Sequence, residues 1–206
     1  SAASDVYKRQ IKSDGSACAE NVIIDSDLRI TVITSELIRI EKGSFCDLPT
    51  QTVLFRNLGK VDFSFKNTSN RINVKTDKCE FCVSECGELQ SVRLSDGRFV
   101  TDFKNGNLKG TRRTLDVTFG RVKLADGIVS RNGVALTDDS ASLTLLPDGT
   151  VSPRSQVGQD TYVYAYGCNY LSALRDFYRI SGETPLIPRF CLGNWWSRFW
   201  RYTQDE

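Results

Sequence analysis

The stretch NVIIDSDLRITVITSELIRIE, residues 21–41, decides the fold class. It holds three runs, NVIID, LRITVI and ELIRIE, in which apolar and polar residues alternate. Successive side chains of a β-strand point to opposite faces, so a period of two predicts strands. Thr34 and Ser35 fall between the second and third runs and predict a turn. The stretch therefore predicts three consecutive β-strands.

Further runs of the same kind follow along the chain. They are VDFSF (61–65), RINVKT (71–76), LQSVRL (89–94), RFVTDF (98–103), GIVS (127–130), GVALTD (133–138), SLTLL (142–146) and TYVYAY (161–166). Ser95-Asp96-Gly97 joins two of them, and Asp-Gly between alternating runs is a strong hairpin signal. Many short strands with Gly-containing turns at short spacing predict an all-β sandwich.

One helix is expected after the last of these runs. Asn169 is a good N-cap residue, and Gly182 stands where a C-terminal cap belongs. Pro185 prevents the helix from continuing. The apolar residues that helical spacing places on one face are Leu171, Leu174, Phe177 and Tyr178.

The composition excludes several classes of function. A chain of 206 residues suits one domain, or one domain with part of a second. The net charge of +2 gives no basic excess for nucleic acid, and the apolar runs are too short to span a membrane. The absence of His excludes Ser-His-Asp and Cys-His catalysis and His-ligated zinc. Asp and Glu are left as the main groups for acid–base chemistry.

The beginning of the sequence suggests an incomplete product. The chain contains no Met, which predicts a fragment or a processed protein. Residues 1–10, SAASDVYKRQ, resemble translated adapter DNA and fit nothing that follows, so we expect an artefactual segment there.

Seven Cys are scattered along the chain, an odd number that favours reduced thiols in a cytoplasmic protein. Three of them form C-x-x-C-x-x-x-C at Cys79, Cys82 and Cys86. One interpretation is a zinc or iron–sulfur site. The pattern offers one knuckle and no second C-x-x-C, so we favour thiols on a strand and its turn, with no bound metal or other cofactor.

Two groups of residues are candidates for binding. Asp138 and Asp139 form a carboxylate pair after an expected strand; the pair suits a solvated turn, or one hydrogen bond to a sugar hydroxyl. Adjacent residues usually point apart, so the pair is a poor match for the two carboxyls of a glycosidase. The aromatic end of the chain suits either the core of a further domain or sugar stacking; its rings are Trp195, Trp196, Phe199, Trp200 and Tyr202.

Several segments, in order, resemble glycoside hydrolase family 31, the retaining α-glucosidases and α-xylosidases. They are DLPTQTVLFRN (47–57), LKGTRRTLD (108–116), LADGIVSRNGVALTDDS (124–140), YAYGCNYLSALRDFYRISGETPLIPRF (164–190) and LGNWWSRFW (192–200). The similarity runs from about Ser35 to the end of the chain. Cys168 departs from the family pattern, and the segment from Cys79 to Cys86 has no recognised counterpart in it.

The resemblance implies a galactose-mutarotase-like β-sandwich over residues 11–184. It further implies that residues 185–206 begin a catalytic (β/α)₈ barrel, with the first barrel strand over 188–198. The family's nucleophile and acid/base are Asp residues of later barrel strands, so no catalytic residue is expected in this chain. The resemblance gives substrate-binding roles to one of Asp138 and Asp139, and to Trp196 and Arg198.

We therefore predict that the chain is the N-terminal part of a retaining α-glycosidase, most specifically an α-glucosidase. This part alone is expected to be inactive. Its expected partners are an oligosaccharide and the rest of its own barrel. The alternatives are a stand-alone, non-catalytic sugar-binding module and a metal-dependent fold built on the three clustered Cys. The sequence does not determine which sugar and linkage the parent enzyme cleaves, or whether it hydrolyses or transfers the sugar. It does not determine the oligomeric state either.

Overall fold

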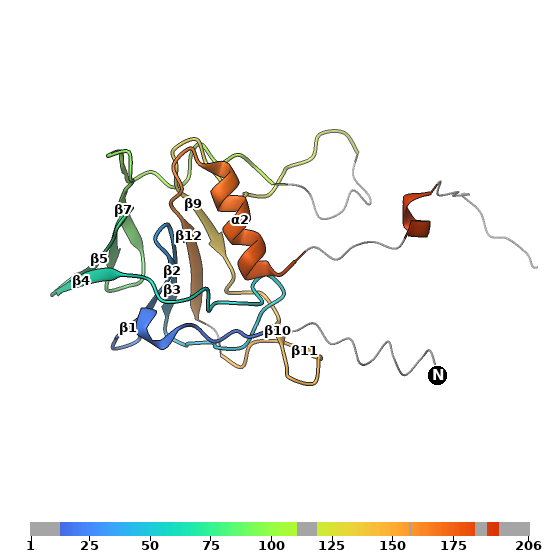
Figure 1. Cartoon of the computed structure of the whole chain (residues 1–206), viewed down its shortest axis with the longest axis horizontal. Helices are drawn as coiled ribbons and strands as arrows, with labels where there is room; N and C mark the ends of the chain where they lie inside the picture. The colour runs from blue at the N-terminus through green and yellow to red at the C-terminus, as the bar shows by residue number, and fades with distance from the viewer. Residues whose placement is uncertain (1–12, 111–118, 157, 184–188, 194–206) are drawn as a thin grey trace, which may run out of the picture.

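The structure is a computed structural model that describes residues 13–110, 119–156, 158–183 and 189–193 (Figure 1). Its elements come in the following order. They are η1 (Ala19–Asn21), β1 (Val22–Asp25), β2 (Leu28–Thr34), β3 (Leu37–Lys42), β4 (Phe63–Thr68), β5 (Arg71–Thr76), β6 (Glu80–Ser84), β7 (Leu89–Arg93), β8 (Phe99–Val100), β9 (Ala135–Asp138), β10 (Thr144–Leu145), β11 (Val151–Ser152), β12 (Gln159–Tyr164), α2 (Tyr170–Ser181) and η2 (Arg189–Leu192).

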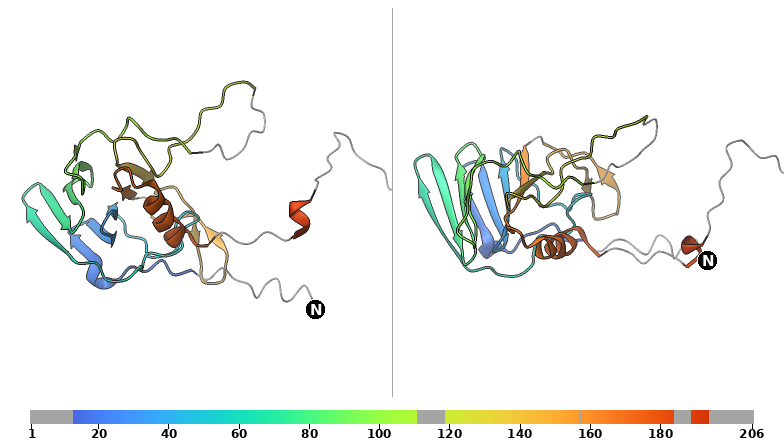
Figure 2. Two further views of the ribbon diagram at one scale, coloured as in Figure 1. Left: turned by 45° about the horizontal axis from the view of Figure 1, so that its top comes forward. Right: turned by 90° about the horizontal axis from the view of Figure 1, so that it is seen from above.

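The strands form two five-stranded antiparallel sheets and a small hairpin. The central sheet has the order β1-β2-β3-β12-β9, and the second sheet has the order β4-β5-β6-β7-β8. Strands β10 and β11 pair by themselves. Figure 2 shows the second sheet on one side of the central sheet and helix α2 on the other. The prediction of a mainly β sandwich with a helix near its end is confirmed.

The face of the central sheet toward the second sheet, here called the inner face, is apolar. Its residues include Ile30 and Ile40, both almost fully buried, and they share one core with Val74 and Phe81 of the second sheet. The alternation in residues 21–41 explains this face, because every second residue of β2 and β3 points toward the second sheet.

The opposite, outer face is covered by loops and by α2. Leu37, Tyr162 and Tyr164 pack there against Ala173 and Ile180 of the helix. Both faces of the central sheet are thus covered, which is why all but the last residue of β2 and of β3 are buried.

The predicted hairpin and helix boundaries are confirmed. Gly97 adopts a φ of 85°, which favours glycine, and its N–H bonds to the carbonyl of Leu94 in the turn between β7 and β8. Asn169 caps α2 by accepting a hydrogen bond from the Ser172 N–H at 3.3 Å. Gly182 ends the helix with a φ of 91°.

The four apolar residues of α2 do not share one environment. Phe177 packs against the core, whereas Leu171, Leu174 and Tyr178 are exposed by 76%, 39% and 51%. The buried face is instead made by Ala173 and Ile180. The packed side of the helix thus combines Ala173, Phe177 and Ile180, and the size of an apolar residue does not identify that side.

Two predicted strands differ from the structure. Residues 127–130 contribute a single bridge, between Ser130 and Asn107, instead of a strand. Of the expected barrel strand over 188–198, residues Arg189–Leu192 form the 3₁₀ helix η2. A strand needs a neighbour for its backbone hydrogen bonds, and no described strand pairs with this segment. Residues 188 and 194–198 lie outside the described residues. No helix in the described part of the chain is long and apolar enough to cross a membrane.

Candidate functional site

Asp138 and Asp139 lie at the end of β9, and their side chains have opposite environments. β9 is an edge strand of the central sheet, where Asp138 pairs with Thr161 of β12. Asp138 is exposed, and its Oδ1 accepts a hydrogen bond from the Ser140 N–H at 2.9 Å. Asp139 is completely buried. The prediction that the two side chains point apart is confirmed.

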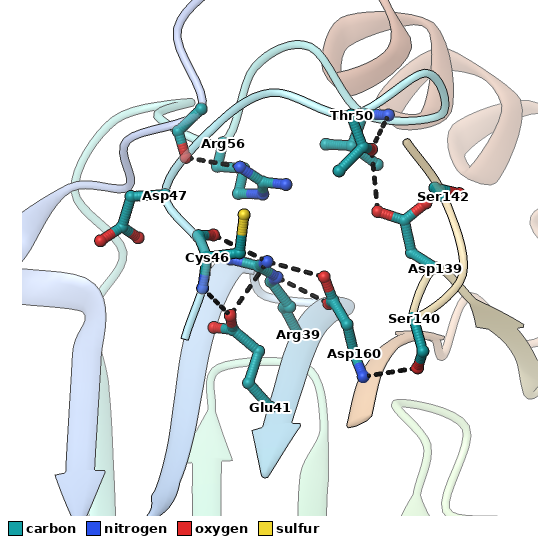
Figure 3. Close-up of polar contacts among 12 residues, drawn as sticks. Arg39, Glu41, Cys46, Asp47, Thr50, Arg56, Asp139, Ser140, Ser142 and Asp160 are labelled. Carbon is teal, nitrogen blue, oxygen red and sulfur yellow. Dashed lines mark hydrogen bonds and ion pairs between the residues drawn. The ribbon is translucent and has the colours of Figure 1, made fainter. Parts of the chain in front are cut away.

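Asp139 is fixed from several directions. Its Oδ2 accepts hydrogen bonds from Thr50 Oγ1 at 2.8 Å and from Arg154 Nη2 at 3.2 Å (Figure 3 shows the first). Its N–H bonds to the carbonyl of Asp160 at 2.8 Å, and its carbonyl accepts from Arg154 Nη2 at 2.7 Å. The Asp139 side chain and backbone therefore tie the loop after β9 to the body of the domain.

A buried ionic network continues from this loop across the outer face of the central sheet. Arg39 of β3 donates two parallel hydrogen bonds to Asp160 of β12, at 2.8 Å and 2.7 Å (Figure 3). Both side chains are only 1% exposed. The paired strands set this geometry: Arg39 lies opposite Tyr162 in the register, so Arg39 and Asp160 are diagonal neighbours on the outer face. A bidentate pair of this kind is both strong and directional.

The network extends to the loop before Thr50. Arg39 Nη2 also lies 3.0 Å from Glu41 Oε1 and donates to the carbonyl of Cys46 at 3.0 Å. Glu41 accepts from the Cys46 N–H at 2.9 Å and from Arg29 Nε at 2.6 Å. The network thus contains three guanidinium groups and three buried carboxylates. They belong to Arg29, Arg39 and Arg154, and to Glu41, Asp139 and Asp160.

The charges of the network control the ionisation of its members. Burial alone would raise the pKa of Asp160, but the hydrogen bonds and charges of Arg39 and Arg154 outweigh it and lower that pKa. Next to this pair, burial raises the pKa of Tyr162 to about 12, so its phenol stays protonated at neutral pH. The Tyr162 oxygen accepts a hydrogen bond from Arg56 Nε at 2.7 Å.

Two polar atoms of the site are buried without a hydrogen-bond partner among the described residues. They are Asp139 Oδ1 and Arg56 Nη2. Arg56 is otherwise satisfied by Tyr162 and by the carbonyls of Gly15 and Leu48.

The arrangement can present one carboxylate on a rigid support. Asp139, Arg154 and Asp160 hold the loop, and Asp138 is left exposed at its start. An ionised carboxylate accepts hydrogen bonds through both oxygens, which suits a ligand rich in hydroxyl groups. Asp139 has no surface through which a ligand could reach it.

Sequence patterns did not point to Arg39, Arg154 or Asp160 as site residues. A signal was present for two of them: Arg39 lies inside the run ELIRIE, and Asp160 directly precedes TYVYAY. Charged residues within strands that are covered on both sides must be paired. Arg154 lies beyond any strand pattern, and only the tertiary structure brings it to Asp139.

The three clustered Cys do not converge. Cys79 is buried and its Sγ lies 3.4 Å from the Ala165 carbonyl, whereas the Sγ of Cys82 faces Gln90. Cys86 is exposed and contacts Ser84. Burial raises the pKa of Cys79 to about 12, so this thiol stays protonated. Among the described residues, no group of three or more potential ligands could hold a metal ion.

The other two predicted binding residues, Trp196 and Arg198, lie outside the described residues. The same holds for the rest of the aromatic segment from Trp195 to Tyr202.

Comparisons with known proteins give similarities to solved structures. No protein-family model and no curated protein matches the chain. A glycoside hydrolase family 31 dextranase from Flavobacterium johnsoniae is similar in two structures, one a mutant with isomaltotriose and one with glucose. Identity is 15% in both, with TM-scores of 0.44 and 0.45, covering 85% of this chain and 28% of the dextranase.

An uncharacterised protein from Listeria monocytogenes, in complex with glucose, magnesium and calcium, is similar at 15% identity with a TM-score of 0.40. The match covers 87% of this chain and 23% of that protein. The chain thus spans about a quarter of the length of these structures. Members of family 31, the family that the sequence motifs indicate, are among its structural neighbours. Similarity at this level carries no argument about activity.

Proposed function

We propose that this chain is the N-terminal β-sandwich of a retaining α-glycosidase and supplies one wall of its sugar pocket. The observation that carries the proposal is the rigidly held loop at 138–142, which begins with the last three residues of the motif LADGIVSRNGVALTDDS (124–140) and presents Asp138. The ordered series of family-like segments gives this loop its expected place near the mouth of the barrel. The expected specificity is for terminal α-linked glucose.

The parent reaction needs two carboxyl groups outside this chain. One carboxylate attacks the anomeric carbon while a carboxylic acid protonates the leaving oxygen, and water then hydrolyses the glycosyl-enzyme. The role of the present chain is positioning. Asp138 accepts hydrogen bonds from sugar hydroxyls, and Asp139 and Arg154 fix the loop that carries it. Trp196 and Arg198 contribute a stacking surface and a hydrogen-bond donor from the start of the barrel.

The first test is the DNA downstream of the codon for Glu206. If the proposal is correct, the open reading frame continues there and encodes Trp-x-Asp-Met-Asn-Glu. In the complete enzyme, Asp138→Ala then raises KM for an α-glucoside, with a loss in kcat/KM of about tenfold or more, typical of one hydrogen bond to a charged group. The matched control is Asp148→Ala, an exposed turn carboxylate.

Two results contradict the proposal. One is hydrolysis of α-glucosides by the purified 206-residue chain, which is expected to be inactive. The other is an in-frame stop directly after Glu206 in the source gene. Sugar binding by the chain in that second case would instead support a stand-alone, non-catalytic binding module.

A further inference from the structure

A cleft of about 450 Å³ opens between the two sheets. One wall comes from the inner face of the central sheet, through Ile40, Leu136 and Thr161. The other wall comes from the turn between β6 and β7 and from the segment 101–104 that follows β8. The cleft therefore lies where the apolar core of the sandwich reaches the surface.

The floor of the cleft is apolar. Leu89, Phe103 and Leu136 are all half-buried residues that pack against the main core. All three line the cleft. A ring such as that of Phe103 can stack on the C–H face of a ligand ring.

The rim of the cleft is polar and carries both donors and acceptors. Gln159 Nε2 is held by the Gly87 carbonyl at 2.9 Å, and Asp102 is occupied by Asn105 at 2.8 Å. The remaining groups are the Glu88 carboxylate, the Lys104 ammonium and the Thr101 hydroxyl. Among the described residues, no hydrogen bond or ion pair engages these three side-chain groups.

We propose that this cleft binds a neutral saccharide of one or two rings. Its volume is within the range of small-molecule sites, about 300–1,000 Å³. An apolar floor with donors and acceptors around it matches the amphipathic faces of a pyranose. The two carboxylates of Glu88 and Asp102 outnumber the single ammonium of Lys104, so an anionic ligand is disfavoured.

The cleft is a different site from the one in which Asp138 is proposed to bind sugar. Asp138 stands in the same cross-strand row as Thr161 and Ile40, which places it beside the cleft. It does not line the cleft, and its Oδ1 is engaged by the loop through Ser140. The cleft proposal does not require that the parent protein be a glycosidase.

The test is an NMR titration of the 206-residue chain with maltose and with isomaltose, followed by amide shifts. Sugar concentrations up to about 50 mM would detect dissociation constants near 1 mM. We expect the largest shifts at Leu89, Phe103, Leu136 and Thr161. Thr101→Ala, an exposed change, and Phe103→Ala should each weaken binding, the latter by about tenfold. The control is Phe65→Ala, an exposed ring on β4 at the far edge of the second sheet.

The outcomes are distinguishable. No shift at the cleft amides with either sugar overturns the proposal, as does unchanged affinity in both cleft variants. Binding lost in Asp138→Ala and retained in the cleft variants would assign the sugar to the loop and overturn the cleft site. Binding retained in Asp138→Ala and weakened in the cleft variants supports the cleft, whatever the parent activity proves to be. Equal binding of glucuronate would contradict the inferred preference for a neutral ligand.

Discussion

The two faces of the central sheet are both buried, yet they are stabilised by different interactions. The inner face packs Ile30, Ile40 and their neighbours against a second sheet, with apolar contacts throughout. The outer face buries Arg39, Glu41 and Asp160 at one end and tyrosines under a helix at the other. Alternation in sequence assigns residues to a face. It does not reveal whether the polar face meets water or protein.

The difference has an energetic consequence. Apolar burial tolerates changes of shape at modest cost, whereas a buried ion pair is intolerant of losing one partner. The outer face should therefore respond more sharply to single substitutions and to pH than the inner face. It also carries the loop that presents Asp138, so disturbance there should reach the candidate site.

The largest effect is expected for Arg39→Ala. It leaves Asp160 as a buried carboxylate without its bidentate partner and removes one of the two guanidinium groups that face Glu41, which costs about 3–5 kcal/mol of unfolding free energy. Urea unfolding followed by circular dichroism measures this. Arg93→Ala, an exposed strand residue, is the control and should change stability by less than about 0.5 kcal/mol. A loss below about 1 kcal/mol in Arg39→Ala would show that the network is not required for stability.

A second comparison uses the two sides of α2. Ile180→Ala removes a fully buried side chain and should cost about 2–5 kcal/mol. Leu171→Ala removes a side chain that is 76% exposed and should stay within about 0.5 kcal/mol. Both are measured by thermal or urea unfolding. Equal losses in the two variants would mean that the exposed apolar side of the helix packs against something in the intact chain.

The pH dependence of stability separates the faces further. The pKa of Asp160 is lowered in the folded state, so the folded protein binds fewer protons than the unfolded one as pH falls. Its contribution is complete above the ordinary Asp value of about 3.9 and is lost as pH falls through the folded value. Protonation removes only the ionic part of the interaction, so the effect is smaller than that of Arg39→Ala.

Unfolding free energies measured at pH values from about 2 to 7 test this sign. The wild-type curve should fall on the acid side more steeply than that of Asp160→Asn, whose side chain does not titrate. Ile30→Ala, on the inner face, should lower the whole curve without changing its slope. Parallel curves for wild type and Asp160→Asn would refute the assigned shift.

Apart from the control variants, the smallest loss of stability is expected at the start of α2. Asn169→Ala removes the cap on the Ser172 N–H and should cost about 1 kcal/mol. Asn169→Asp retains an acceptor and should restore most of the loss. Thermal unfolding of the two variants tests whether this cap stabilises α2, the helix that covers part of the outer face.

The sequence alone determined the fold class, most strand positions, the hairpin at Asp96-Gly97 and both ends of α2. These are local properties: a period of two, a left-handed turn position and a cap each depend on residues near one another in the chain. The sequence also placed Asp138 and Asp139 at a strand end and predicted that they point apart. The same local rules could not say which of the two would be buried.

Only the tertiary structure decided what covers each face. Arg39 meets Asp160 across 121 positions of sequence, and Arg154 reaches Asp139 from outside any regular pattern. The packed side of α2 was likewise fixed by the shape of the sheet beneath it, which selected Ala173 and Ile180 over Leu171 and Leu174. These ion pairs and packing contacts join segments that are far apart in the sequence, and no periodic pattern of residues predicts them.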